Sequence, residues 1–213
     1  MTLQIDVPRL EQTAAVAARE AGVSDYTWRE FVGRLALLKN HNLSMYAHSL
    51  RVGVYAHGIA LDEGWDDCRL PLLGGCGHDI GKCRVPNSIL DCTEALNPAD
   101  FETIHRHPED GYELLKDQFP LAAMVAGLHH KFTPKAYGIE LSDAPPWLQA
   151  AHTHKVIEAT MVVMVCDFWD AITTRRNAST TIDPDNVGEL GEYLRKHFTD
   201  WPGRVSWLTS NKI

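Results

Sequence analysis

The sequence predicts an all-α protein. Apolar residues recur at helical spacing along most of the chain, and prolines, glycines and capping residues fall where such helices begin and end. No segment shows the alternation of apolar and polar residues that is typical of a half-buried strand. With 213 residues, 45% of them hydrophobic, the chain can bury a full core as one domain, or as one domain with a small extension.

Four helices are expected before residue 80. Pro8 suits a first helical turn, and the helix that it opens ends before Gly22. Ser24 can cap a second helix, whose apolar residues follow the i, i+3, i+4, i+7 pattern of a buried face. A third helix covers residues 43–61, and a fourth begins near residue 66 and leads to His78.

Prolines set the next boundaries. Residues 82–96 form a connection with at most one helical turn. Asn97-Pro98 is a cap followed by a first-turn proline. The helix that this pair opens must stop near His107, because Pro108 follows and begins the next helix over residues 109–117.

The last part of the chain holds the most apolar helix. Pro120 opens a helix that ends at about residue 130. Residues 131–150 are the one long irregular stretch, either a lid over a site or a surface insertion. A strongly apolar helix over residues 152–176 follows and is expected to be central. One more amphipathic helix covers residues 185–198.

Charge and composition exclude several classes of partner. The formal charge is −8, whereas a binder of long nucleic acid normally carries a basic face. The five cysteines form no close Cys-x-x-Cys pair and are interpreted as reduced thiols. The N-terminus lacks the order of a signal peptide, and the most apolar short run, residues 161–166, is too short to span a bilayer. We expect a soluble, cytoplasmic protein without membrane contact.

One short motif carries the strongest chemical signal. His78-Asp79 places an imidazole beside a carboxylate, and transition metals accept both ligand types. The two side chains reach one metal most easily where a helix ends, since adjacent helical residues do not share a face. Gly81 offers such an end through the left-handed conformation that closes helices. Lys82 follows, and an ammonium group can hold a phosphate oxygen.

Further histidines and a buried carboxylate complete a candidate metal centre. Asp167 lies inside the apolar helix, where a carboxylate is costly unless it is paired or bound to metal. Five histidines and two aspartates suffice for two metal sites that share one bridging carboxylate, with ions roughly 3.5–4 Å apart that activate water for phosphoryl transfer. The full set is His48, His78, Asp79, His107, His129, His130 and Asp167.

The order of these segments resembles the HD superfamily of metal-dependent phosphohydrolases, most closely its HD-GYP branch. The matching segments begin at His48, His78, His107, His129 and Asp167, the last of them reaching Arg176. The resemblance covers about residues 40–180 and implies an HD-domain helical bundle. It divides the chain into N-terminal helices that pack on the core (1–40), an HD/HD-GYP-like catalytic core (41–180), and a C-terminal helix and tail of the same domain (181–213).

The resemblance also implies roles for the ligands. His48, His78, Asp79 and Asp167 would hold one divalent transition-metal ion, iron or manganese. Asp79 would bridge to a second ion held by the histidines of the other two segments, His107, His129 and His130. Lys82 would contact the substrate phosphate and, with Asp79, is assigned a catalytic role.

Two departures from the branch affect these expectations. Members with three metals carry a glutamate four residues before the first histidine, where this chain has Ser44, so we expect two ions. The branch also carries a glutamate after the tandem histidines, then Asp-Gly and Gly-Tyr-Pro. Here residues 131–138 read Lys-Phe-Thr-Pro-Lys-Ala-Tyr-Gly. This degenerate loop weakens the assignment of cyclic di-GMP as substrate but not the metal chemistry.

Three neighbouring residues are interpreted as structural. Asp170 lies three residues past Asp167 on the same helical face and is expected to support the ligands rather than to join them. Arg51 is expected to hold a carboxylate or a neighbouring helix. His41 shares a helical face with His48 and is left out of the ligand set.

Three hypotheses on function follow. The first is a phosphodiesterase that hydrolyses a cyclic dinucleotide or another nucleotide with water activated by two metal ions, Lys82 stabilising the developing charge. The second is a di-iron HD-type oxygenase, which an anaerobic assay would distinguish because hydrolysis needs no oxygen. The third is a degenerate signalling domain that binds a nucleotide without turnover. A small-molecule nucleotide or phosphate ester is the expected partner, and a homodimer is left open.

Overall fold

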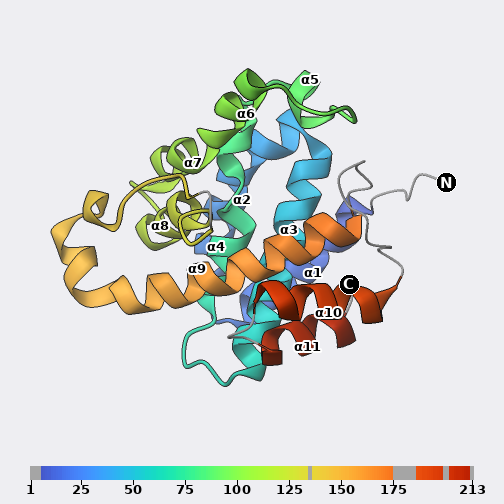
Figure 1. The fold of residues 1–213 in the computed structure, drawn as a ribbon. Helices are drawn as coiled ribbons and strands as arrows, with labels where there is room; N and C mark the ends of the chain where they lie inside the picture. Colours follow the sequence, from blue (N-terminus) through green and yellow to red (C-terminus); the bar gives the residue numbers. More distant parts are fainter. Residues whose placement is uncertain (1–5, 134–135, 175–185, 199–201, 212–213) are drawn as a thin grey trace.

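Helices form the regular structure of residues 6–133, 136–174, 186–198 and 202–211, which are the residues that the computed structural model describes (Figure 1). No β-strand occurs in these ranges, which confirms the all-α prediction. The elements are α1 (Val7–Glu20), α2 (Asp25–His41), α3 (Leu43–Asp62), α4 (Arg69–Gly77), the 3-10 helix η1 (Ile80–Arg84), α5 (Asn87–Leu90), α6 (Pro98–His105), α7 (His107–Leu115), α8 (Pro120–Leu128), the 3-10 helix η2 (Leu141–Asp143), α9 (Pro146–Thr174), α10 (Val187–His197) and α11 (Pro202–Ser210).

The long helix α9 crosses the molecule and organises the helices around it (Figure 1). It packs against α3, α4 and α8, and its buried face contributes Val162, Val165 and Trp169 to one hydrophobic core. A second core joins α1 and α2 to α3 and α4. Since α9 touches the helices that carry the predicted ligands, it brings Asp167 next to residues far from it in sequence. Among the described helices none combines the length and apolarity that crossing a bilayer requires.

Side-chain caps fix several helix starts as the sequence predicts. The Ser24 hydroxyl accepts a hydrogen bond from the Thr27 amide at the start of α2. The Asn97 side chain accepts from two amides of α6, and Asp100 accepts from the Asn97 amide, which completes a capping box. These bonds are local, so the residues that make them are readable from the sequence alone.

Two features of the C-terminal part differ from the prediction. The central helix begins at Pro146, so the irregular stretch ends earlier than residue 150. A further helix, α11, begins at Pro202, where the sequence analysis expects none. In both cases the proline occupies the first helical turn, where its missing amide costs nothing, although a proline is also common in loops. The division of the chain at residues 40 and 180 remains a prediction.

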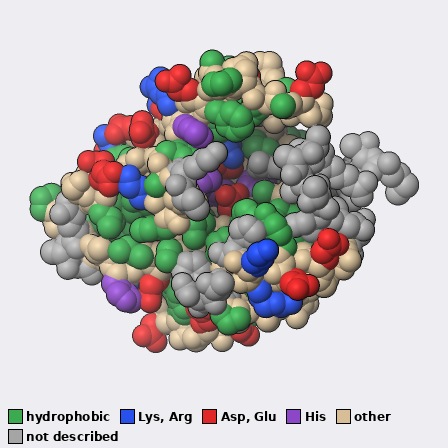
Figure 2. Space-filling model, in the orientation of Figure 1, with side chains coloured by type: hydrophobic (Ala, Val, Ile, Leu, Met, Phe, Trp, Pro, Cys, Tyr) green, Lys and Arg blue, Asp and Glu red, His purple; other side chains and the backbone are tan. Residues whose placement is uncertain are grey.

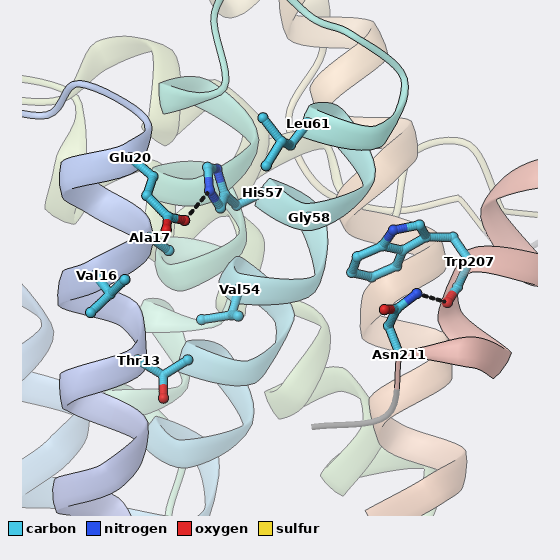
Figure 3. A pocket seen from close by; sticks show the side chains of 10 residues that line it. All are labelled: Thr13, Val16, Ala17, Glu20, Val54, His57, Gly58, Leu61, Trp207 and Asn211. Atoms are coloured by element: carbon cyan, nitrogen blue, oxygen red, sulfur yellow. Dashed lines mark hydrogen bonds and ion pairs between the residues drawn. The ribbon is translucent and has the colours of Figure 1, made fainter.

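A groove of about 420 Å³ lies where α11 meets α1 and α3 (Figure 3). The Trp207 indole packs directly on Gly58, because a Cβ at residue 58 would lie 2.3 Å from the ring. On the α1 side His57 is buried and contacts the Glu20 carboxylate at 3.4 Å. The groove contains none of the predicted metal ligands, so the candidate site lies elsewhere.

Candidate metal centre

The His78-Asp79 pair lies at a break between two helices, as predicted. α4 ends at Gly77 and the 3-10 helix η1 begins at Ile80. Gly81 does not end a helix in the left-handed conformation, which corrects the expectation, because the glycines with positive φ in the described chain are Gly22, Gly64 and Gly138. Its role is close approach: a Cβ at residue 81 would lie 2.0 Å from the His107 carbonyl oxygen. Gly81 therefore lets η1 lie against the start of α7.

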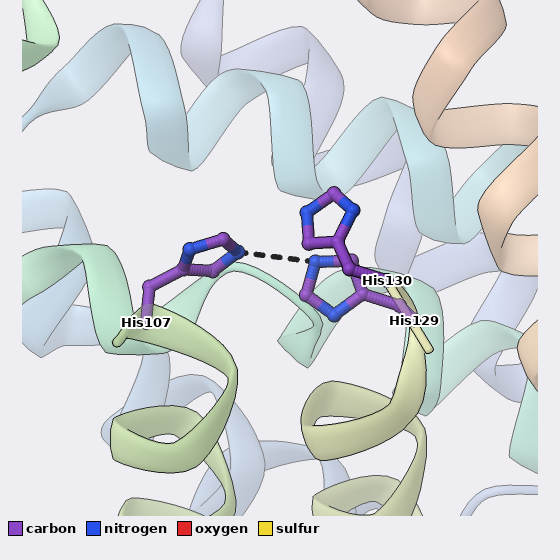
Figure 4. Close-up of side chains that lie close together, drawn as sticks. All are labelled: His107, His129 and His130. Atoms are coloured by element: carbon purple, nitrogen blue, oxygen red, sulfur yellow. Dashed lines mark hydrogen bonds between the residues drawn. The ribbon is translucent and has the colours of Figure 1, made fainter. Parts of the chain in front are cut away.

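The structure brings all seven predicted ligands into one cluster. Possible ligand atoms of His48, His78 and Asp167 lie within 4.8 Å of one another, and so do those of the second triplet. That triplet is shown in Figure 4: the first residue of α7 faces the tandem pair that follows α8. Its members are His107, His129 and His130. Figure 2 shows a hollow in the surface where histidine, acidic and basic side chains gather.

Asp79 lies between the two triplets and turns one carboxylate oxygen toward each. Oδ2 lies 3.5 Å from His48 Nε2 and 3.4 Å from His78 Nε2. Oδ1 lies 3.2 Å from His107 Nε2 and 3.8 Å from His129 Nε2. Ligand atoms bound at about 2.1 Å to one ion lie roughly 3.0–3.4 Å apart. The observed separations are close to this range on both sides of the carboxylate.

Four of the histidines are oriented by a hydrogen bond that the ring nitrogen Nδ1 donates. His78 donates to the Gly75 carbonyl at 2.7 Å, His107 to the Ile104 carbonyl at 2.6 Å, and His129 to the Ala126 carbonyl at 2.7 Å. His48 Nδ1 donates instead to the Asp170 carboxylate at 2.7 Å. An imidazole whose Nδ1 carries the hydrogen leaves Nε2 as a lone pair that can bind metal.

Several inward-facing atoms of the cluster lack hydrogen-bond partners. His48 Nε2, His78 Nε2 and Asp79 Oδ1 are buried and have no hydrogen-bond partner. His107 Nε2 and His129 Nε2 lie 3.1 Å apart although both rings donate through Nδ1. Buried acceptors that face one another are unfavourable unless a cation lies between them. The residues present therefore fit bound metal cations.

The pKa values of the cluster are shifted in both directions. Burial raises the pKa of Asp79, but His78 and Lys82 outweigh it and hold that pKa well below its usual value. Burial lowers the pKa of His78, but the carboxylates of Asp79 and Asp167 outweigh it and raise the pKa to about 10. Burial lowers the pKa of His130 to about 3. Metal binding at such a centre needs ionised carboxylates and neutral imidazoles, so it would displace a proton from His78.

Lys82 reaches the centre from η1. Its Nζ lies 2.5 Å from Asp79 Oδ2, and its side chain is 10% exposed. From the sequence Lys82 is expected to contact the substrate phosphate, and here it also neutralises Asp79. A buried ammonium beside a carboxylate is satisfied only while that contact lasts.

Asp170 and Arg51 support the first triplet, as the sequence predicts. Asp170 is fully buried, accepts from His48, and forms a two-point ion pair with Arg51 at 2.6 and 2.9 Å. The pKa of Asp170 is lowered because His48 and Arg51 outweigh its burial. His41 lies apart from the ligands and contacts the Val85 carbonyl. Arg176 and Lys135 lie outside the described residues.

Two further residues with aromatic rings, Tyr137 and His105, border the second triplet. The Tyr137 ring lies against His130 with centroids 4.5 Å apart and against His105 at 4.2 Å, nearly parallel to both. Neither residue is among the site residues that the sequence predicts. Their sequence signal is weak, because no spacing links the end of α6 to the loop after α8.

Comparison with known proteins agrees with this geometry. The HD domain family model matches residues 45–173. The chain belongs to the HD domain family, which confirms the resemblance to the HD superfamily.

The chain is also similar to two phosphodiesterases of cyclic dinucleotides. It is 30% identical over 146 residues to a cyclic di-GMP phosphodiesterase of Pseudomonas aeruginosa, covering 67% of this chain and 33% of the relative. It is 28% identical over 172 residues to the 3'3'-cGAMP-specific phosphodiesterase 3 of Vibrio cholerae, covering 69% and 35%. The chain thus spans about a third of the length of these relatives.

A solved structure supports the fold. The HD domain of the L. monocytogenes phosphodiesterase PgpH superposes with a TM-score of 0.58 at 19% identity, covering 83% of this chain and 93% of that one. The same domain in complex with cyclic-di-AMP gives a TM-score of 0.57 at 18% identity, covering 83% and 92%. The all-helical HD bundle is therefore confirmed.

Proposed function

We propose that this chain is a metal-dependent phosphodiesterase that hydrolyses a cyclic dinucleotide or a related nucleotide. The observation that carries the proposal is Asp79, whose two carboxylate oxygens face two separate groups of imidazole nitrogens. A carboxylate in this position would be able to join two metal sites, an arrangement that phosphoryl transfer uses. The relatives named as phosphodiesterases of cyclic dinucleotides support the substrate class.

The proposed ligand sets follow the two oxygens. Asp79 Oδ2 with His48, His78 and Asp167 would hold one ion, and Asp79 Oδ1 with the second triplet, His107, His129 and His130, would hold the other. Nitrogen and oxygen ligands in these numbers suit iron or manganese. When bound, the ions would activate a water molecule and neutralise charge on the phosphate. Ser44 is exposed in the first turn of α3, so we propose two ions rather than three.

Lys82 is proposed to change partner when the centre is loaded. Ions on Asp79 would take over the neutralisation of its carboxylate. The ammonium, already 2.5 Å from Asp79 Oδ2, would then be able to hold a phosphate oxygen of the substrate. This assigns Lys82 to catalysis and Asp79 to assembly of the centre.

The loop over residues 131–138 is proposed to relax substrate choice. Metal ions bind phosphate without regard to base, so discrimination depends on the walls of the pocket. Lys131 forms an ion pair with Glu140, which directs this cation along the loop. We therefore expect cyclic di-GMP to be hydrolysed without exclusive preference over other cyclic or linear dinucleotides.

The test is kcat/KM across cyclic dinucleotides, linear dinucleotides and a generic aryl phosphodiester, with and without oxygen. We expect oxygen-independent hydrolysis that Asp79→Asn abolishes together with metal retention. Lys82→Met should keep the metals and lower kcat about 100-fold, the usual cost of losing one charge-stabilising donor. Lys116→Met is the matched control, since Lys116 forms the same i, i+3 pair with Glu113 on the surface. Absence of hydrolysis by metal-loaded protein, or activity that requires oxygen, would refute the proposal.

A further inference from the structure

His130 differs from the other four histidines of the centre. Each of those donates a hydrogen bond through Nδ1 to a carbonyl or a carboxylate. Among the described residues, by contrast, the His130 ring makes no hydrogen bond, and it packs against the rings of His107, His129 and Tyr137. Figure 4 shows it beside the contact that joins His107 and His129. A metal ligand normally needs a second partner to fix its orientation.

Tyr137 takes the place of that partner. Its ring lies 4.5 Å from the His130 ring at an interplanar angle of 24°, which is a stacked arrangement. The contact of His130 with His129 is tilted by 45°, and that with His107 is nearly perpendicular. Tyr137 is in turn stacked on His105 at 4.2 Å and 26°. Offset stacking restricts how a ring can rotate, so Tyr137 limits the positions that the His130 ring can adopt.

The loop that carries Tyr137 is tied to the helix that carries His130. The Ile139 amide donates to the Gly127 carbonyl in the last turn of α8. The Ile139 side chain covers Gly127, where a Cβ would lie 2.4 Å from it. Gly138 has φ +102°, and a Cβ there would lie 2.3 Å from the same carbonyl oxygen. The backbone therefore sets the register between Tyr137 and the tandem histidines.

We propose that Tyr137 is a positioning residue that orients His130 toward the second ion by stacking, in place of the hydrogen bond that orients the other histidines. The inference rests on the proposed metal centre and adds to it a determinant of affinity for one ion of the pair. The aromatic ring carries the effect, because the stacking uses the ring face and the hydroxyl makes no hydrogen bond to the described residues.

The test is a titration of the metal-free full chain with Mn²⁺, which resolves the affinity of each site. Tyr137→Leu should weaken one site by about 10-fold or more, the usual effect of removing a partner of a ligand, and leave the other within about twofold. Tyr137→Phe should retain both affinities because it keeps the ring. Phe132→Leu is the matched control: Phe132 is an aromatic residue of the same loop, 38% exposed. It should also retain both affinities.

Thermal unfolding of each variant shows whether it is folded, and Tyr137→Met replaces the leucine variant if the latter does not fold. Unchanged affinities in the leucine or methionine variant would overturn the inference. Equal weakening of both sites would also overturn it, since that result indicates a general loosening. A loss in Tyr137→Phe as large as in Tyr137→Leu would assign the effect to the hydroxyl and overturn the stacking argument. A wild-type chain that binds fewer than two ions would refute the metal centre itself.

Discussion

Asp170→Asn tests how the first triplet is supported. The wild-type carboxylate is fully buried, accepts from His48 Nδ1 at 2.7 Å, and holds Arg51 at two points. An amide has one oxygen and one NH₂ group, so one of these donors would face another donor. The substitution also removes the negative charge that pairs with the Arg51 guanidinium, and the Arg51 side chain is only 12% exposed.

The expected magnitude follows from this burial. Removing one partner of a buried ion pair costs about 3–5 kcal/mol. In a chain of this size each kcal/mol lowers Tm by about 2–4 °C, so Tm should fall by about 6–20 °C. Misorientation of His48 should weaken the ion that it binds by about 10–100-fold.

Circular dichroism melting and Mn²⁺ titration measure the two effects. Asp67→Asn is the matched control, because Asp67 also forms a two-point pair with Arg69, at 2.8 and 2.7 Å, but the two side chains are 34% and 56% exposed. There we expect a loss of about 1 kcal/mol or less and unchanged metal affinity. A Tm change for Asp170→Asn no larger than that of the control, with metal affinity intact, would refute the reasoning.

Two further predictions concern stability. Gly81→Ala should destabilise the fold by about 1–3 kcal/mol or more, because a Cβ there meets the backbone of α7. A Cβ at residue 33, by contrast, would meet nothing within 4 Å. Gly33→Ala should therefore stabilise the fold by about 0.5–1 kcal/mol, because alanine favours a helix over glycine. Urea unfolding measures both, and similar values would contradict the packing argument. The metal-free protein should be most stable near pH 6.5, the ordinary pKa of histidine, to within about a unit. The pKa of His130, lowered to about 3 by burial, makes the unfolded chain bind more protons below that pH, so stability rises with pH there. The pKa of His78, raised to about 10 by carboxylates that outweigh burial, makes the folded chain bind more protons above it, so stability falls as pH rises further. Urea midpoints between pH 4 and 9 that change in one direction only would contradict this expectation.

The parts of the fold that the sequence predicts are those set by local chemistry. Ser24 and Asn97 bond to amides within three residues, so their helix starts are readable from the chain alone. The start of α9 and the existence of α11 depend on packing instead. Pro146 and Pro202 suit a loop and a first helical turn equally well, and tertiary contacts decide between them.

The ligand types could be predicted, but their arrangement could not. Histidines at helix ends and Asp167 in an apolar helix stand out because they are costly unless they have a function. The three-dimensional arrangement alone shows that the two oxygens of Asp79 face different histidines. It also shows that the Lys82 ammonium contacts the same carboxylate. The position of Tyr137 depends on a loop tied to α8 through one amide, which no sequence pattern records.

The central claim is that one carboxylate joins two metal sites. Titration of the metal-free chain with Mn²⁺, followed by electron paramagnetic resonance, tests it most directly, because ions that share a bridging ligand are magnetically coupled. The account predicts saturation at two ions per chain with the spectrum of a coupled pair, and loss of that spectrum in Asp79→Asn. Saturation at one ion, or two ions with the spectra of isolated Mn²⁺, would contradict it.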